Sequence, residues 1–369
     1  MGILLTILIA VAVVSTIAAA LAGILVLSEH FLADYGPCSI SINDERKFEV
    51  KGGKDLLSAL NSEKVFIPSA CGGRATCGLC KIKVLEGGGL LLPTEEPHLD
   101  KKEVESGTRL ACQVRIRNDL KIEIPTELLA VREYVCKCTD ITDLTHDMKK
   151  FRLELVEPTT IDYVPGQYIQ LLTPAYEKSS EEVYRAYSIA SDPADKSAME
   201  LIIRLVPGGI CTTYCFEYLK EGDEVRINGP YGDFRLSDTD APIVFVAGGS
   251  GMAPIKCMLH EMKNTDSKRK AVYYFGANEP RELCLVDLMK EFEKELADFH
   301  FVPAVNDLKD SDDKGYERGL VTDVVKRDLQ DAGRSEAYLC GSPGMIDATV
   351  AVLKELGMPQ DNIFYDKFE

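Results

Sequence analysis

The chain has 369 residues, of which 46% are hydrophobic and 27% charged, and its formal net charge is -17 with a pI of about 4.9. At roughly 100–200 residues per domain, this length predicts two to four domains. An acidic surface repels phosphate, which argues against nucleic acid as a partner. It suits a soluble cytoplasmic surface, although acidity alone names no function.

The first 27 residues predict a membrane anchor. No charged residue lies between Ile3 and Leu27, and about 20 apolar residues suffice to span a bilayer. The alternative is a cleaved signal peptide, which has an apolar run of about 7–15 residues behind a basic start. The longer run and the absence of Lys or Arg before it favour a retained transmembrane helix in the segment 1–34.

A small β-rich domain is expected over residues 35–130. The stretch "CSISINDERKFEVKGGK" alternates apolar and polar residues, turns at Gly52 and Gly53, and becomes helix-like from Asp55. Further strands are expected in "CKIKVLEGG" and "RLACQVRIRNDLKIEIP". The cysteine-rich loop "CGGRATCGLC" lies between the helix and these strands.

Two more domains are expected after residue 130. Short strands such as "KKFRLELV", "YIQLL" and "MELIIRLV" recur over 131–238, and this spacing predicts an antiparallel β-barrel. From Ala241 onward, apolar strands such as "PIVFVAGG" and "KRKAVYYFGA" alternate with helical patterns. This alternation predicts a doubly wound parallel sheet over 239–369, so the whole chain combines α+β and α/β domains.

The twelve cysteines do not resemble a disulfide framework, because they cluster near residue 71 and otherwise scatter. Four of them follow the pattern C-x5-C-x2-C with a fourth after 31 intervening residues, namely Cys71, Cys77, Cys80 and Cys112. Four thiolates suit a [2Fe–2S] cluster or zinc. One C-x2-C pair and the loop glycines, which allow backbone N–H groups to reach sulfide, favour [2Fe–2S].

The remaining cysteines have plainer interpretations. A thioredoxin-like role for the C-x2-C pair would need a βαβ context, which the pattern around it does not offer. Cys136 and Cys138 occupy alternate positions on one face of a strand. Four of the other six are expected to be small apolar fillers, namely Cys211, Cys215, Cys257 and Cys284.

Three glycine-rich or strand motifs point to nucleotides. "RAYSIAS" (185–191) lies in a strand pattern, and "PGGICTTYCFEYL" (207–219) has paired glycines before a helix start, where backbone N–H groups bind phosphate. "VFVAGGSGMAPI" (244–255) is a buried strand, a turn and a helix start. Its candidate NADH residues are Gly248, Gly249, Gly251 and Pro254. "LCGSPGMI" ends a later strand, and Cys340 is either a core residue or a neighbour of the nicotinamide.

With these motifs the chain resembles ferredoxin:NADP reductase-type flavoproteins that carry an N-terminal ferredoxin domain. It is more similar to the family of NADH-oxidising F subunits of the sodium-pumping NADH:quinone oxidoreductase, whose order is one transmembrane helix, a β-grasp [2Fe–2S] domain, an FAD barrel and an NADH domain. "LLPTEEPHL" and "RLACQV" also look like that family. The resemblance covers essentially the whole chain.

The resemblance implies roles for individual residues. Arg185 would pair with an FAD phosphate, Tyr187 would pack on the isoalloxazine ring, and Ser188 would bond near N5. Gly209, Cys211 and Thr212 would hold the FAD pyrophosphate. Phe368 would cover the other flavin face until the nicotinamide displaces it, which makes Ser188, Cys340 and Phe368 the candidate catalytic residues.

The resemblance also implies the reaction and the place of the protein. NADH would give a hydride to FAD, and single electrons would pass to the cluster, to membrane-embedded redox subunits and finally to quinone. The protein would be a single-pass subunit of the bacterial inner membrane with its soluble domains on the cytoplasmic side. NADH is expected rather than NADPH, because "NEPREL" after the strand "VYYFGA" offers no basic cluster for a 2′-phosphate.

Two departures from that family keep the acceptor open. The stretch between "GQYIQL" and "RAYS" is short, and the ending "YDKFE" also looks like that of soluble oxygenase reductases. An anchored NADH-dependent reductase serving an oxygenase or another acceptor protein is therefore the alternative enzyme. A non-enzymatic redox sensor built on the cluster is the third interpretation.

Overall fold

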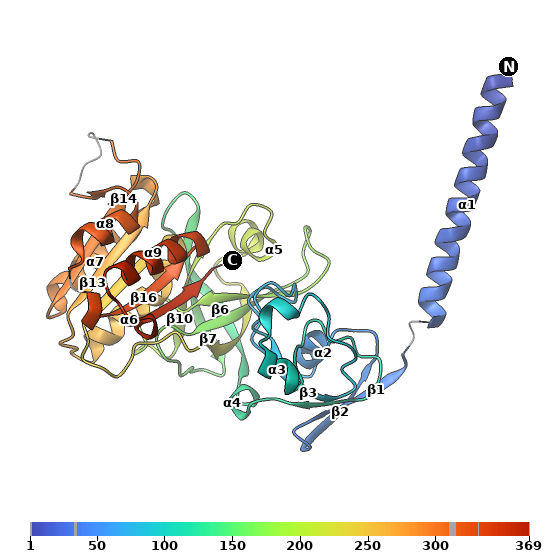
Figure 1. Cartoon of the computed structure of the whole chain (residues 1–369), viewed down its shortest axis with the longest axis horizontal. Coiled ribbons are helices and arrows are strands. Elements are labelled where there is room, and N and C mark those ends of the chain that lie inside the picture. The colour runs from blue at the N-terminus through green and yellow to red at the C-terminus, as the bar shows by residue number, and fades with distance from the viewer. Residues whose placement is uncertain (1, 33–34, 310–314, 331, 369) are drawn as a thin grey trace. The chain divides into compact units, whose positions relative to one another are not determined.

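The computed structural model describes residues 2–32, 35–309, 315–330 and 332–368. The chain divides into a smaller unit, Met1–Ile67 with Gly73–Ala130, and a larger unit, Pro68–Gly72 with Val131–Glu369. Figure 1 shows the element order along the chain. Each unit is described by itself below.

The N-terminal segment forms one helix, α1 (Gly2–Leu32) (Figure 1). Over the described residues, no helix meets both the length and the apolarity that crossing a membrane requires. The fold-class prediction is therefore not confirmed for its transmembrane helix. Part of the apolar run on which that prediction rests, at residues 3–5, 8 and 25–27, has side chains outside the described set.

The smaller unit is built on a mixed five-stranded sheet with the order β2-β1-β5-β3-β4, in which β1 and β5 run parallel. In β1 every second side chain is buried, as a half-buried strand requires. Its elements are β1 (Pro37–Ile42), β2 (Arg46–Lys51), α2 (Leu56–Ser62), β3 (Lys81–Glu86), α3 (Lys101–Glu105), β4 (Thr108–Leu110), β5 (Leu120–Glu123) and α4 (Thr126–Leu129).

Helix α2 begins where the sequence predicts it. Asp55 is its N-cap, and the Asp55 carboxylate accepts a hydrogen bond from the Ser58 N–H at 2.8 Å. Leu56 and Leu60, one turn apart, are fully buried in the core of this unit. The cap and the apolar face together hold the helix on the sheet.

The first half of the larger unit is an antiparallel six-stranded sheet with the order β10-β7-β6-β11-β8-β9. A bridge between Ile189 and Leu201 joins the ends of the sheet, so the predicted barrel closes there. Its elements are β6 (Arg132–Asp143), β7 (Met148–Glu157), β8 (Tyr168–Thr173), β9 (Val183–Ser188), β10 (Ala198–Arg204), α5 (Ile210–Thr213) and β11 (Glu224–Tyr231). A π-helical turn, Tyr214–Tyr218, continues α5.

The second half is a parallel six-stranded sheet with the order β15-β14-β13-β12-β16-β17 and helices packed against it (Figure 1). The central strand β12 is apolar throughout and buried, as expected of a strand covered on both faces. Its elements are β12 (Ile243–Gly248), α6 (Met252–Asn264), β13 (Ala271–Ala277), α7 (Val286–Glu295), β14 (Phe299–Val305), β15 (Glu317–Arg318), α8 (Val321–Asp328), β16 (Glu336–Gly341), α9 (Pro343–Glu355) and β17 (Ile363–Lys367).

Candidate functional site

The cysteine loop brings together two of the four predicted cluster ligands. The Cys80 thiol contacts Cys112, and Cys77 lies near enough to act on Cys80 electrostatically. The Cys112 contact and burial raise the pKa of Cys80, so this protein environment disfavours free thiolates unless positive charge is supplied, as iron would supply it. The Gln113 amide also lies 3.6 Å from the Cys112 sulfur and donates to it.

The remaining predicted ligand, Cys71, belongs to a different structural unit from the other three. Cys71 lies in the short segment Pro68–Gly72, which belongs to the larger unit, whereas the other three lie in the smaller unit. In the part of the chain that the structure describes, no three His, Cys, Asp or Glu side chains are arranged to hold a metal ion. The complete ligand set therefore stays a prediction, although the sulfur donors of Cys80 and Cys112 suit a cluster.

His98 supports the cysteine loop from the side. Its Nε2 lies 2.8 Å from the carbonyl oxygen of Ala75, a residue in the left-handed conformation at φ 58°. Gly78 also has a left-handed φ of 65°, and a Cβ there would lie 2.7 Å from His98 Nδ1. Glycine is therefore required at 78 for both its conformation and the close approach of the imidazole.

The predicted FAD residues lie on β9 and at the start of α5. Arg185 and Tyr187 stand on β9, opposite Leu171 and Ile169 of β8. Arg185 donates to the Tyr184 carbonyl at 2.8 Å. Within the larger unit, a Cβ on Gly72 would overlap the Arg185 guanidinium, so this arginine reaches the segment that carries Cys71.

Cys211 joins the two parts of the predicted FAD site. Its thiol interacts with Cys215, Thr173 and Tyr187, with the Arg185 charge nearby. The Cys215 contact, together with these groups, outweighs burial and lowers the pKa of Cys211 to about 7. Cys211 is therefore a shared neighbour of Arg185 and Tyr187.

Gly209 and Thr212 shape the turn before α5. Gly209 is the N-cap of the helix, and the Thr212 hydroxyl lies 3.2 Å from both the N–H and the carbonyl oxygen of Val206. A hollow of about 280 Å³ opens beside this turn, and its lining includes Gly209 and Tyr176. Tyr176 donates its hydroxyl to the Ile210 carbonyl at 2.7 Å.

The glycine turn after β12, which is predicted to bind NADH, packs tightly against the end of β16. A 3₁₀ turn, Gly249–Gly251, leads directly into α6. A Cβ on Gly251 would overlap the carbonyl oxygen of Cys340, so only glycine allows these two chain segments to approach. Pro254 falls in the first turn of α6, where a missing N–H breaks no helical bond.

Ser188, Cys340 and the C-terminal strand form the predicted catalytic group. Cys340 is fully buried on β16 and is the register partner of Asp366 on β17. Burial raises the pKa of Asp366 to about 6, against the effect of its hydrogen bond with Ser188. Phe368 packs on the core beside them, and its N–H donates to the Gly341 carbonyl at 2.9 Å. A carboxyl that titrates near neutrality therefore stands beside the residue predicted to lie near flavin N5.

Two residues of this site, Asp366 and Arg204, were missed from the sequence. Asp366 lies on β17 two residues before the predicted Phe368, and this closeness to a predicted site residue was a signal that was available. Arg204, at the end of β10, was not detectable from its surroundings. Its Nη1 would lie 3.3 Å from a Cβ on Gly249, and its Nε donates to Asp147 at 2.6 Å. A guanidinium at the glycine turn suits a pyrophosphate.

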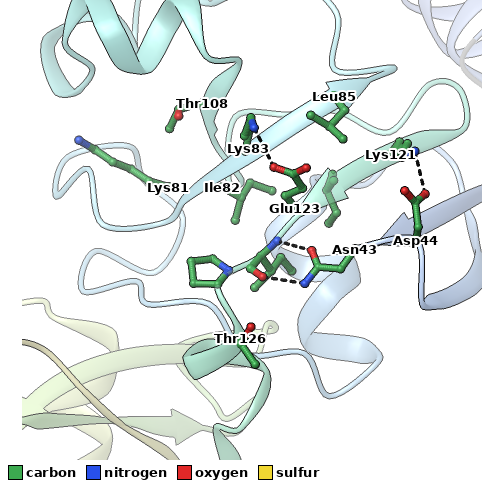
Figure 2. A pocket seen from close by; sticks show the side chains of 13 residues that line it. Asn43, Asp44, Lys81, Ile82, Lys83, Leu85, Thr108, Lys121, Glu123 and Thr126 are labelled. Carbon is green, nitrogen blue, oxygen red and sulfur yellow. Dashed lines mark hydrogen bonds and ion pairs between the residues drawn. The ribbon is translucent and has the colours of Figure 1, made fainter.

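A groove of about 590 Å³ on the smaller unit is lined by none of the predicted site residues, although Lys81 in its lining directly follows Cys80. Figure 2 shows its lining side chains, among them Lys83 paired with Glu123 at 2.8 Å and Lys121 paired with Asp44 at 2.7 Å. Each of these lysines is neutralised by a carboxylate, so those pairs offer no free cation to an anionic ligand.

Three family models match successive parts of the chain. A "2Fe-2S iron-sulfur cluster binding domain" matches residues 40–117. An "Oxidoreductase FAD-binding domain" matches 135–236, and an "Oxidoreductase NAD-binding domain" matches 245–351. The predicted [2Fe–2S], FAD and NADH cofactors and their order along the chain are thereby confirmed.

Among solved structures, two reductases match most of the chain. The cytochrome P450 reductase GcoB from Amycolatopsis is 29% identical, with a TM-score of 0.71, over 90% of this chain and 98% of that one. The ferredoxin reductase in carbazole 1,9a-dioxygenase is 25% identical, with a TM-score of 0.69 and the same coverage. At this coverage, the similarity to each of the two reductases includes the iron–sulfur, FAD and NAD domains of this chain.

Full-length relatives match the chain from end to end. The F subunit of the Na(+)-translocating NADH-quinone reductase of Neisseria gonorrhoeae is 33% identical over 394 aligned positions, which cover 96% of this chain and 97% of the relative. The protein of that name from Pasteurella multocida is also 33% identical, over 97% of this chain and 98% of its own length. The chain belongs to the family of F subunits of the Na(+)-translocating NADH-quinone reductase.

Proposed function

We propose that this chain is the electron-input subunit of a Na(+)-translocating NADH:quinone reductase, where it oxidises NADH and passes electrons to membrane-embedded partner subunits and ultimately quinone. The observation that carries the proposal is the end-to-end match to the F subunits, at 33% identity over 96% of the chain, across all three cofactor domains. When bound, FAD accepts a hydride and the [2Fe–2S] cluster accepts single electrons, which links a two-electron donor to one-electron partners.

The chain's own residues would prepare the hydride transfer. Ser188 acts on the Asp366 carboxyl, whose raised pKa of about 6 would let it hold a proton beside the predicted flavin position. Cys340 and Gly251 bring the nicotinamide-binding turn against the end of β16. Phe368 is held at the Gly341 carbonyl, where it would cover the flavin until NADH arrives.

The cofactor ligands follow the residues predicted from the sequence. The cluster would be held by Cys71, Cys77, Cys80 and Cys112. The FAD would be held by Arg185, Tyr187, Ser188, Gly209, Cys211 and Thr212, and the NADH pyrophosphate by Gly248, Gly249, Gly251 and Pro254. Contact of Cys80 with Cys112, and of Cys211 with Tyr187, supports the first two sets.

The proposal includes a membrane anchor at the N-terminus. Helix α1 runs from Gly2 to Leu32, and no charged residue occurs from Ile3 to Leu27. A single pass there would keep the soluble domains on the cytoplasmic side, beside their membrane-embedded acceptor. No ionisable residue occurs in that apolar run, so ion transport would belong to partner subunits.

The test uses the full chain in detergent, with absorbance and EPR spectra recorded before and after NADH. Bleaching of a flavin spectrum together with a new reduced [2Fe–2S] signal is the expected result. The Cys77→Ala variant should lose the cluster signal while its FAD is still reduced by NADH. Loss of FAD reduction in that variant would show that the domains do not act as separate modules.

A second candidate function is an anchored reductase that serves an oxygenase or another acceptor protein. It is favoured by the structural similarity to GcoB. It is also favoured by the length of this chain, which has 369 residues, whereas its alignment to the gonococcal relative runs over 394 positions. Affinity purification from solubilised native membranes distinguishes the two. Co-purifying multi-helix redox subunits support the first function, and their absence with rapid reduction of a soluble acceptor supports the second.

A further inference from the structure

One face of α6 carries three polar side chains spaced one helical turn apart. The Lys256 ammonium donates to the Ala190 carbonyl and to the Glu200 carboxylate, each at 2.7 Å. One turn further on, His260 Nδ1 lies 3.6 Å from Asp192. After another turn, the Asn264 amide donates to the same Asp192 carboxylate at 2.7 Å.

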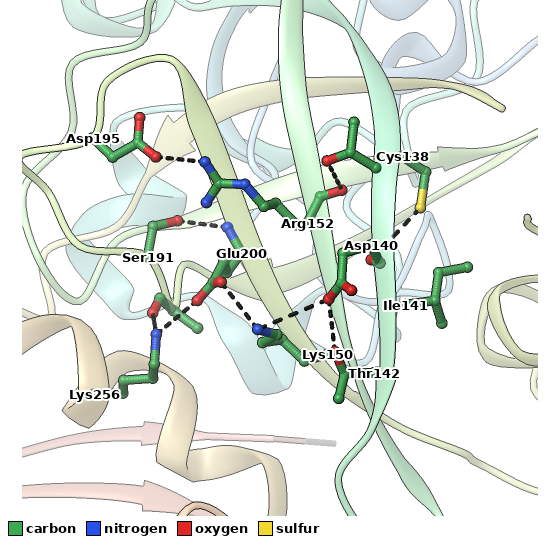
Figure 3. Close-up of polar contacts among 12 residues, drawn as sticks. Cys138, Asp140, Ile141, Thr142, Lys150, Arg152, Ser191, Asp195, Glu200 and Lys256 are labelled. Atoms are coloured by element: carbon green, nitrogen blue, oxygen red, sulfur yellow. Dashed lines mark hydrogen bonds and ion pairs between the residues drawn. The ribbon is translucent and has the colours of Figure 1, made fainter. Parts of the chain in front are cut away.

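These contacts fasten α6 to a short stretch of the barrel. Ala190 and Asp192 lie immediately after β9, the strand that carries the FAD motif, and Glu200 lies on β10. Figure 3 shows Lys256 reaching from α6 toward Glu200, with Lys150 on the other side of the same carboxylate. One helix of the nicotinamide-binding half is therefore bonded directly to the flavin-binding half.

Lys256 is the buried member of the set. Only 5% of its surface is exposed, and its neighbours Ala190, Ala253 and Met252 belong to a hydrophobic core. Burial alone would raise the pKa of Glu200, but Lys256 and Lys150 outweigh it and lower that pKa, so the carboxylate stays charged. Displacing this ammonium from its two short bonds would be costly, because it would leave a charge buried without a partner.

The two ends of this connection lie close in sequence to residues predicted to hold the two cofactors. Ala190 is two residues beyond Ser188, which is predicted to lie near flavin N5. Lys256 is five residues beyond Gly251 in the turn that would hold the NADH pyrophosphate. The bonds of Lys256 thus link the segment that follows Ser188 to the helix that begins after the predicted NADH turn.

We propose that Lys256 is a positioning residue for hydride transfer, whose bonds to Ala190 and Glu200 set the distance between the nicotinamide and the flavin. The inference rests on the proposed NADH-to-FAD reaction and adds a residue that touches neither cofactor. Hydride transfer needs the reacting atoms about 3–3.5 Å apart, and a misplacement of about 1 Å can lower the rate about a hundredfold.

The experiment compares Lys256→Met, Lys256→Arg and the control Lys263→Met in the FAD-loaded, full-length protein. Met fills a similar volume without donating, whereas Arg keeps the charge and the donors. Lys263 lies on the same helix with 44% of its side chain exposed and pairs with Glu295 at the surface. The measurements are FAD content, the Kd for NADH, and the single-turnover rate of flavin bleaching at saturating NADH and 4-deuterated NADH.

The expected result is a rate per bound flavin at least about tenfold lower in Lys256→Met, with a deuterium isotope effect no smaller than in the wild type. Lys256→Arg should recover most of the rate, and Lys263→Met should match the wild type. A merely structural role would lower FAD content or thermal stability and leave the rate per bound flavin unchanged, and that outcome would overturn the proposal.

Two further controls keep the outcome decisive. If Lys256→Met fails to fold, Glu200→Gln takes its place, because it removes the carboxylate and keeps the Lys256 bond to Ala190. A wild-type rate in Glu200→Gln would then overturn the proposal, and a slower rate with full FAD would support it. If NADH fails to bleach even the wild-type flavin, the proposed function itself is wrong, which is a separate result.

Discussion

The Arg109 guanidinium and the Glu95 carboxylate form a paired, buried ion pair, with Nε donating at 2.9 Å and Nη2 at 2.7 Å. The Glu95 side chain is fully buried, and its oxygens also accept from the N–H groups of Leu92 and Leu110. Burial acts to raise the pKa of Glu95, but Arg109 and these N–H groups lower it overall. The pair holds the segment that leads to His98 and so to the cysteine loop.

Breaking this pair is expected to destabilise the iron–sulfur domain strongly. Arg109→Met leaves the Glu95 carboxylate buried without its partner, and such losses cost about 3–5 kcal/mol. The control Lys83→Met removes an ion pair with Glu123 in which both side chains are more than 40% exposed, and such pairs contribute about 0–1 kcal/mol. Urea unfolding followed by the cluster absorbance measures both. Equal losses in the two variants would contradict the prediction.

His98 is expected to protect the cluster by holding the loop at Ala75. His98→Ala removes that hydrogen bond and the ring packed against Gly78, so the loop should open more often and release iron faster. We expect cluster loss to a chelator to accelerate severalfold, while the rate of FAD reduction by NADH stays unchanged. His300→Ala, at an imidazole that is 73% exposed and paired with Glu293, is the control and should lose its cluster at the wild-type rate.

Much of the fold could be predicted because the local patterns and the packing agree. Asp55 caps a helix whose apolar face is buried, and the apolar stretch ending at Gly248 forms the central strand of a parallel sheet. Cys136 and Cys138 were predicted on one strand face, and both are fully buried on β6. Boundaries at 130/131 and 238/239 stay predictions.

The sequence could not reveal the contacts that join distant segments. Arg204 meets Gly249, and Lys256 meets Ala190, only because β10 and α6 pack together. Nothing in the spacing of these two cations sets them apart from those that lie at the surface. Cys71 illustrates the same limit, because its place in the loop pattern does not determine which unit its segment packs with.

Gly251 is expected to be essential for the nicotinamide site. In Gly251→Ala the new methyl group overlaps the Cys340 carbonyl oxygen, so β16 and the start of α6 must separate. NADH should then bind at least about tenfold more weakly, while the barrel keeps its FAD. Gly344→Ala in α9 is a matched control, since no atom lies within 4 Å of its new Cβ. Titration of flavin bleaching with NADH measures both, and unchanged binding in Gly251→Ala would refute the assignment of this turn.

Asp366 is expected to make stability depend on pH in an unusual direction. Its pKa in the fold is raised to about 6, whereas an unfolded Asp titrates near about 3.9. The folded state therefore holds this proton more tightly, and the resulting stabilisation is complete below about pH 4 and is lost as the pH rises through about 6. Asp366→Asn removes the titration.

The free energy of unfolding of the wild type should consequently fall relative to that of Asp366→Asn between about pH 4 and about pH 6.5. Above that range, the difference between the two proteins should stay constant. Urea unfolding of the two proteins at several pH values checks this, with the exposed Asp361→Asn as a control for losing a carboxylate from the same C-terminal segment. The same variant, Asp366→Asn, should also flatten the dependence of flavin bleaching on pH near about 6, because Ser188 would then lack a titrating partner. If the wild type and Asp366→Asn kept a constant stability difference over this range, the prediction that the fold raises the pKa of Asp366 would be wrong.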